Sequence, residues 1–509
     1  MASVKRNIIA NYAGSFWSAL MGLAFVPLYI KFMGIEAYGL VGFFGTLVSL
    51  FSILDMGLSV TLSREMARRS SLTEQEATTR DLLRTIETIY WGVAVIIGAA
   101  VIMLSFPIAR YWVNPEKLTI ADVQQAVMIM GLVVVLRWPF GMYQGGLMGL
   151  QRQVLVNIIT SISATLRGLG AVAVLIMVSS TIQAFFMWQI VVSGAETFTM
   201  AACLWHSLPK KNQKATFKKE ILGEVWHFAA GMTGIAVVST VLTLTDKIVL
   251  SKMLTLEMFG YYTLAWTVAG ALNRMAGPIV SALFPRFSQL VPSGDVKGLT
   301  TLYHKSCQIM SVIIMPISAI LALFSYEVLS IWTGDPLIAQ QTCLVLSVLI
   351  IGTAGNAMMN MPFALQLAYG WITLALWVNV VGIVILIPLL IWLVSLYGML
   401  GGAVVWALLN TGYVLIAIRI MHMRILKGEL WHWYLKDLGS PLLSAMGVGI
   451  LARIFMPRHW SSELTVFCLV IVTGLGIVAA ALSVSGIRAD ARYYLSCLAK
   501  AVTKRVPAI

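Results

Sequence analysis

The sequence predicts an all-α polytopic membrane protein with 14 transmembrane helices, arranged as two parallel six-helix repeats followed by two C-terminal helices. Three observations support this fold class. Apolar residues make up 59% of the chain and charged residues only 11%, which is far outside the range of soluble domains. Many apolar runs are long enough to cross a hydrocarbon layer of ~30 Å as helices. A segment near the N-terminus also recurs in the second half of the chain.

The predicted spans follow one another with short connections. They lie at about residues 8–30, 38–62, 85–106, 122–148, 153–178, 182–205, 224–245, 258–284, 306–325, 338–366, 371–393, 398–420, 438–456 and 463–484. Lys5 and Arg6 precede the first apolar run, as in a signal peptide. That run is too long for a signal peptide and no small-residue cleavage site follows it. We therefore predict that it is a retained first span.

The internal repeat divides the first twelve spans into two halves. Four positions of the segment 29–69 correspond to positions 221 residues later, in the pairs Lys31 and Lys252, Glu36 and Glu257, Tyr38 and Phe259, and Gly39 and Gly260. We predict a six-helix lobe at 1–220, a second at 221–430, and two appended helices with a cytoplasmic tail at 431–509. Because six is even, both copies enter the membrane from the same side, as in transporters whose halves rock about a central site.

The basic residues predict the orientation of the chain. Of the 35 lysines and arginines, 25 lie at the termini and in one alternating set of loops, and 7 lie in the other set. The positive-inside rule therefore places both termini in the cytoplasm. Because the basic residues are dispersed over many loops, nucleic acid is not a predicted partner. The lysine-rich loop 206–220 either contacts anionic lipid headgroups or is a solvated linker.

Several kinds of enzyme site are missing from the sequence. It contains no phosphate-binding GxxxxGK[ST] loop, no CxxC pair and no His/Cys/Asp cluster with metal spacing. We therefore predict no catalytic residue, no metal and no cofactor. The outward loops are short, the longest being about 107–121. Short loops argue against a membrane glycosyltransferase or polymerase, a possibility that a sugar-transfer assay would test.

Ionisable residues inside the spans are the candidate functional residues, because such groups are costly in a membrane and mark substrate or ion pathways. The candidate substrate-binding residues are four arginines, Arg64, Arg137, Arg274 and Arg286. The candidate ion-coupling residues are three acids, Asp55, Glu196 and Asp246.

Each candidate also has a structural interpretation. Arg274 either binds phosphate through its planar fork or forms a buried ion pair, with Asp55 as a candidate partner. Arg137 either binds substrate or bonds carbonyls freed at the Pro139 kink. Glu196 can pair with Arg167 on the neighbouring span. For the rest, the structural roles are an interfacial position for Asp246 and Lys247 and a topogenic role for Arg64 and Arg286.

Several motifs carry a resemblance to a known family. They are Asn7, Asn11 and Tyr12, the GIEAYGL turn at 34–40, Asp55-x-Gly57, SREMAR at 63–68, LFPRFSQL at 283–290 and YGMLGGAVVWALLN at 397–410. In these motifs, and over nearly its whole length, the chain resembles the lipid-linked oligosaccharide flippases of the multidrug/oligosaccharidyl-lipid/polysaccharide exporter superfamily. The resemblance implies fourteen helices, with a cationic cavity between two six-helix lobes.

The resemblance also implies a function in the bacterial inner membrane. An undecaprenyl-diphosphate-linked repeat unit for O-antigen or exopolysaccharide would be flipped from cytoplasm to periplasm by alternating access coupled to an ion gradient. Membrane lipids, a polysaccharide polymerase and a chain-length regulator are the implied partners. A competing interpretation is a cation-coupled multidrug exporter, which needs only twelve spans and an acidic site for cationic drugs. A third is a scaffold for polysaccharide assembly that transports nothing itself.

Overall fold

The computed structural model describes residues 2–55, 57–69, 76–208, 215–219, 240–456, 461–484 and 488. Among these residues, eleven helical segments are long and apolar enough to cross a membrane. They coincide with the predicted spans one to five and nine to fourteen, which confirms the all-helical polytopic class. Helices α10 and α12 coincide with predicted spans six and eight but are less apolar. Most of the predicted span 224–245 lies outside the described residues, and the total of 14 remains a prediction.

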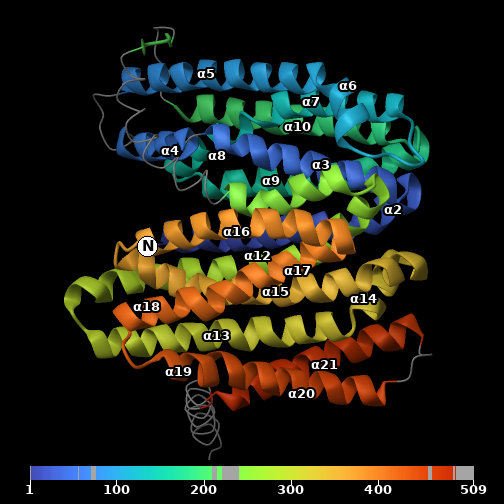
Figure 1. Ribbon diagram of the computed structural model, residues 1–509. Coiled ribbons are helices and arrows are strands. Elements are labelled where there is room, and N and C mark those ends of the chain that lie inside the picture. Colours follow the sequence, from blue (N-terminus) through green and yellow to red (C-terminus); the bar gives the residue numbers. More distant parts are fainter. Residues whose placement is uncertain are drawn as a thin grey trace, which may run out of the picture. The chain divides into compact units, whose positions relative to one another are not determined.

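The chain forms two compact units, Met1–Thr263 and Leu264–Ile509. Helix α12 (Leu256–Ser293) begins in unit 1 and continues in unit 2. Figure 1 shows the helices of each unit packed along one another. The lobe boundaries predicted near residues 220 and 430 remain predictions.

Unit 1 is built from helices that pack around α7 and α9. Helix α1 lies along α9, α4 packs on α8, and α7 contacts both α5 and α10 (Figure 1). The helices are α1 (Ala2–Ala24), α2 (Val26–Met33), α3 (Ile35–Phe51), η1 (Ser52–Asp55), α4 (Leu58–Arg69), α5 (Glu76–Met103), α6 (Ser105–Pro107), η3 (Ile108–Trp112), α7 (Ile120–Arg137), α8 (Phe140–Gly149), α9 (Gln153–Met177) and α10 (Ile182–Ser207). Thr119 and Asp122 cap α7 reciprocally, so its first turn has satisfied donors. The core on the α4–α8 side includes the fully buried Leu62 and Met66.

The second predicted span, 38–62, is wrong as a single helix. Helix α3 ends at Phe51, the tight turn η1 ends at Asp55, and α4 begins at Leu58. Gly57 has φ of +70°, a left-handed conformation that glycine adopts without steric cost and that ends helices. The repeat-related helix α12, by contrast, runs without a break for 38 residues.

The starts of the two repeated helices meet in a close crossing within unit 1. A Cβ on Gly39 would lie 2.4 Å from the Leu256 carbonyl oxygen, and a Cβ on Gly260 would lie 2.3 Å from the Ile35 carbonyl oxygen. Both partners are related by the same 221-residue offset, so the contact is reciprocal. Only glycine permits backbones to approach so closely.

Unit 2 is organised around α13 and α15. Helix α15 packs on α13, α14 and α17, while α20 and α21 pack on each other and on α13 (Figure 1). Besides α12, its elements are α13 (Val296–Leu323), α14 (Ser325–Thr333), α15 (Pro336–Ala368), α16 (Thr373–Tyr397), α17 (Met399–Gly412), η4 (Tyr413–Ala417), α18 (Ile418–Arg424), α19 (Leu430–His432), η5 (Trp433–Gly439), α20 (Ser440–Phe455) and α21 (Ser462–Ser483). The core includes the fully buried Phe287, Tyr303 and Trp433. The two appended helices therefore join this unit through α13.

Candidate functional site

A charged cluster lies inside unit 1, on helices α7, α9 and α10. The Arg167 guanidinium donates a hydrogen bond of 2.7 Å to the Glu196 carboxylate. It also donates to Gln189 at 3.0 Å and to Ser193 at 3.3 Å. The side chains of Arg167 and Glu196 are only 20% and 11% exposed. The predicted pairing of these two residues is therefore confirmed.

Arg137 belongs to the same cluster. It is the last residue of α7, next to the turn at Trp138 and Pro139, and it interacts electrostatically with Arg167 and Glu196. The three side chains carry two positive charges and one negative charge, which leaves an excess of one positive charge. A partly buried excess of guanidinium favours an anion such as phosphate, which its planar donors can bind in a bidentate manner.

Asp55 lies at the helix break between α3 and α4. Its carboxylate accepts hydrogen bonds from the Tyr90 hydroxyl and, at 2.8 Å, from the Ser59 hydroxyl. The side chain is half-buried. A half-buried acid at the end of a broken membrane helix is a position at which transporters bind cations.

Asp246 lies in a helical segment of unit 1 and is 7% exposed. Its carboxylate accepts from the Tyr262 hydroxyl at 2.7 Å and lies 3.3 Å from the Lys247 ammonium. The hydrogen bond from Tyr262 thus connects Asp246 to the first turns of α12.

The remaining three candidate arginines are exposed. Arg274 is exposed along α12 and makes no ion pair within the part of the chain that the structure describes. Arg286 donates a hydrogen bond of 3.0 Å to Gln289 on the same helix. Arg64 is exposed on α4. Of the seven predicted site residues, the structure brings together Arg137 and Glu196.

The repeat also marks two acids that were not among the predicted site residues. Glu36 accepts the backbone N–H groups of residues 116, 117 and 118 at 2.6, 2.9 and 3.2 Å. Its repeat partner Glu257 accepts a hydrogen bond of 2.7 Å from the Lys117 ammonium. This bond lowers the pKa of Glu257 and raises the pKa of Lys117. The fixed 221-residue offset was the signal that could have singled out both acids.

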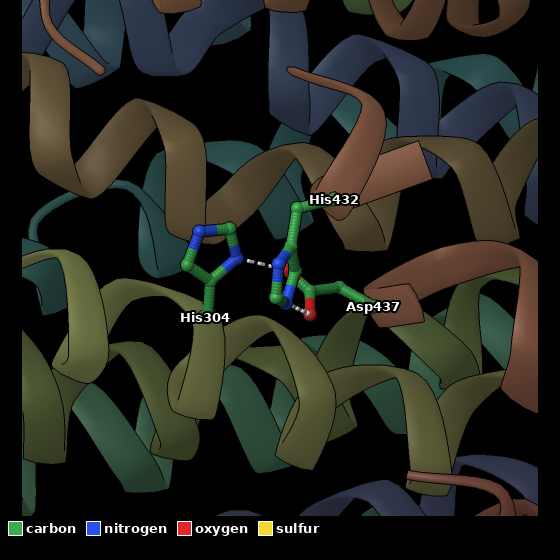
Figure 2. Close-up of side chains that lie close together, drawn as sticks. All are labelled: His304, His432 and Asp437. Atoms are coloured by element: carbon green, nitrogen blue, oxygen red, sulfur yellow. Dashed lines mark hydrogen bonds and ion pairs between the residues drawn. The ribbon is translucent and has the colours of Figure 1, made fainter. Parts of the chain in front are cut away.

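A second cluster of ionisable side chains, in unit 2, was not predicted from the sequence. His304 and His432 each contribute one imidazole nitrogen, and Asp437 contributes one carboxylate oxygen. These three atoms lie within 4.8 Å of one another (Figure 2). Spacing along the sequence does not indicate this cluster, because His304 and Asp437 lie 133 positions apart. Only the packing of η5 against α13 brings them together.

Comparison with known proteins gives consistent results. The model of the family described as "Polysaccharide biosynthesis protein" matches residues 4–291. A Shigella flexneri protein named "Putative O-antigen transporter" is 23% identical over 406 residues, which cover 80% of this chain and 94% of that protein. Its name agrees with our prediction of a transporter rather than an enzyme.

Two solved structures share the fold. The lipid II flippase MurJ in an inward closed conformation matches with a TM-score of 0.70 and 14% identity, over 96% of this chain and 99% of that one. An inward-facing MATE family multidrug resistance transporter of the MOP superfamily matches with a TM-score of 0.64 and 14% identity, over 82% and 98%. These two matches show a shared fold, and together with the family model and the Shigella flexneri relative they confirm the predicted resemblance to flippases of this superfamily. Since the family model covers more than half of the 509 residues, the chain belongs to the polysaccharide biosynthesis protein family.

Proposed function

We propose that the protein flips undecaprenyl-diphosphate-linked oligosaccharide repeat units from the cytoplasmic to the periplasmic leaflet of the bacterial inner membrane, for O-antigen or exopolysaccharide synthesis. The observation that carries the proposal is the family match together with the similarity to a protein named as an O-antigen transporter. The fold shared with a lipid II flippase supports the same class of substrate.

The charged cluster of unit 1 supports the binding step. Arg137 and Arg167 outnumber Glu196, and the three lie on helices that coincide with the predicted spans four, five and six. A diphosphate entering this low-dielectric environment would interact with two guanidinium groups more strongly than in water. In the proposal, Arg274 provides a further phosphate contact, and Arg64 and Arg286 attract the headgroup where it enters. The polyprenyl chain remains in the lipid.

Asp55 supports an ion-driven cycle. It combines a carboxylate with a helix break, and its partners Tyr90 and Ser59 are neutral. An acid without a basic partner can exchange a proton or a sodium ion at lower cost than one fixed in a salt bridge. We propose that ion exchange at Asp55 drives the alternation, with Asp246 and Glu196 as further candidate coupling residues.

Reconstitution tests this function directly. Purified protein in liposomes that contain an undecaprenyl-diphosphate oligosaccharide should expose the internal sugar to an external glycosidase faster than protein-free liposomes do. Arg137→Ala should slow this exposure, Arg137→Lys should slow it less, and Arg152→Ala, which removes an exposed arginine outside the cluster, should leave it unchanged.

Absence of flipping by folded wild-type protein would contradict the proposal. A drug-susceptibility change on expression, without flipping, would favour the multidrug exporter. Sugar transfer by the purified protein would favour the glycosyltransferase or polymerase. Partnership with a polymerase or a chain-length regulator would be tested separately, by co-purification.

A further inference from the structure

The cluster in unit 2 lies where α13 meets the segment formed by α19 and η5. His304 is on α13, His432 ends α19, and Asp437 is in η5. Glu429 precedes α19 and lies beside the two rings. Figure 2 shows both imidazole rings facing the Asp437 carboxylate.

One nitrogen of each ring faces Asp437. His304 Nδ1 lies 2.5 Å from Asp437 Oδ2, and His432 Nε2 lies 3.9 Å from Asp437 Oδ1. The two ring centroids are 4.3 Å apart. Gln308 donates a hydrogen bond of 2.8 Å to Asp437 Oδ1 and so holds the carboxylate in place.

The other nitrogen of each ring faces Glu429. Glu429 Oε2 lies 3.2 Å from His304 Nε2 and 3.9 Å from His432 Nδ1. Of these two contacts, only the one with His304 is within hydrogen-bond distance. If Glu429 accepts the N–H of His304 Nε2, His304 Nδ1 turns its lone pair toward Asp437. A second carboxylate that orients imidazole ligands in this way is a common feature of metal sites.

The buried Asp437 carboxylate needs a compensating positive charge. Asp437 is fully buried and the His304 side chain is only 9% exposed. Among the described residues, no lysine or arginine forms an ion pair with Asp437. A buried carboxylate is costly unless a positive charge compensates it. That charge comes either from a second proton on His304, whose two ring nitrogens both lie against carboxylates, or from a bound metal ion.

We propose that His304, His432 and Asp437 bind a divalent transition metal ion of the zinc class, with Glu429 orienting the His304 imidazole. Two imidazole nitrogens and one carboxylate oxygen are ligands that zinc commonly takes, with water at the fourth position. The side chains of His432 and Glu429 are 38% and 35% exposed, which gives an ion a path from solvent. Bound metal would fasten η5, and with it the appended helices, to α13.

Metal binding to the full-length protein in detergent tests the proposal. After treatment with a chelator, Zn²⁺ alone should bind at about one ion per chain and raise the unfolding temperature. Co²⁺ alone should give the visible absorption of a low-coordinate nitrogen and oxygen site. His432→Ala and Asp437→Asn should abolish this binding, and Glu429→Gln should weaken it by about 10- to 100-fold.

His206→Ala is the matched control, because it removes an exposed histidine from α10 of unit 1. This variant should bind both ions as wild type does. Helical circular dichroism and size-exclusion profiles establish that each variant is folded, and His432→Ala is the mildest change because its side chain is partly exposed. The proposal is overturned if wild type shows no saturable binding, or if folded His432→Ala and Asp437→Asn bind the ions as wild type does.

Discussion

Asp55 is the residue that we propose as the ion-exchange site of the transport cycle. It is a half-buried acid at the break between α3 and α4, bonded to Tyr90 and Ser59. Neither partner carries a positive charge, so the carboxylate retains its capacity for a cation. This arrangement makes the role of its charge testable by substitution.

We expect Asp55→Asn to lower transport about tenfold or more while the protein level is retained, because the amide keeps a hydrogen-bond acceptor but cannot exchange a proton or bind sodium as a carboxylate does. Surface polysaccharide and membrane protein level are the measurements. Tyr90→Phe serves as a comparison, since it removes one hydrogen bond and leaves the acid. Normal surface polysaccharide in Asp55→Asn would show that the charge of Asp55 is not needed.

Arg274 is a second residue whose role can be tested by substitution. Arg274→Ala should abolish polysaccharide export if the planar guanidinium grips diphosphate, and Arg274→Lys should impair it because a lysine keeps the charge but not the bidentate geometry. A pairing role with Asp55 predicts instead that Arg274→Ala leaves an unpaired carboxylate and that adding Asp55→Ala recovers export. Recovery in the double variant, at equal protein level, would exclude the phosphate contact.

At the scale of helices, close crossings depend on glycine. A Cβ on Gly149 of α8 would lie 2.2 Å from the Ser63 carbonyl oxygen of α4, and a Cβ on Gly145 would lie 2.6 Å from that of Ser59. Glycines four residues apart allow backbones to approach in this way. The same crossing supports the helix that follows Asp55.

Gly149→Ala should therefore destabilise unit 1 by about 1–3 kcal/mol, the usual cost of overpacking. Gly141→Ala, on the same helix, meets nothing within 4 Å and should be neutral or slightly stabilising, because alanine has the higher helix propensity. Thermal unfolding of the two purified variants gives the comparison. Equal unfolding temperatures would mean that α4 moves away without cost.

The Lys117–Glu257 contact connects the loop before α7 to the start of α12. Hydrogen bonding lowers the pKa of Glu257 and raises the pKa of Lys117. The stabilisation from Glu257 is therefore fully present above the ordinary glutamate pKa and is lost as pH falls through the lowered value. The stabilisation from Lys117 is lost only as pH rises through its raised value.

We therefore expect Glu257→Gln to lower the unfolding temperature slightly at pH 7, because the contact lies at the surface. The difference from wild type should shrink as pH falls below the ordinary glutamate pKa of about 4.3 and disappear below the lowered pKa of Glu257. Unfolding temperatures measured from acid to neutral pH test this. A difference that persists unchanged in strong acid would assign the effect to packing rather than charge.

At the scale of the whole molecule, orientation in the membrane follows from loop charge. The 25-to-7 bias of basic residues predicts that both termini are cytoplasmic. Reporter fusions after Lys219 and after Lys504 should give cytoplasmic signals, and a fusion after Lys117 should give a periplasmic one. A periplasmic signal after Lys219 would overturn the assignment of two six-helix lobes.

The sequence by itself determined the helical membrane class and the approximate positions of the eleven spans found among the described residues, because the hydrophobicity of ~20 consecutive residues is a local property. It also predicted the Arg167–Glu196 pair, because opposite charges on neighbouring membrane helices pair to offset the cost of leaving water. Its motifs indicated the family for the same reason, because they are stretches of contiguous sequence.

Only the tertiary structure decided where the second span breaks and which distant groups meet. Gly57 was visible in the sequence, but only the structure shows that it has a positive φ and lies between η1 and α4. Glu36 and Glu257 gain their roles from one loop that both of them contact. His304 and Asp437 face each other only because η5 packs on α13. Contacts between residues more than a hundred positions apart arise from the packing of whole elements, which no local pattern of residues specifies.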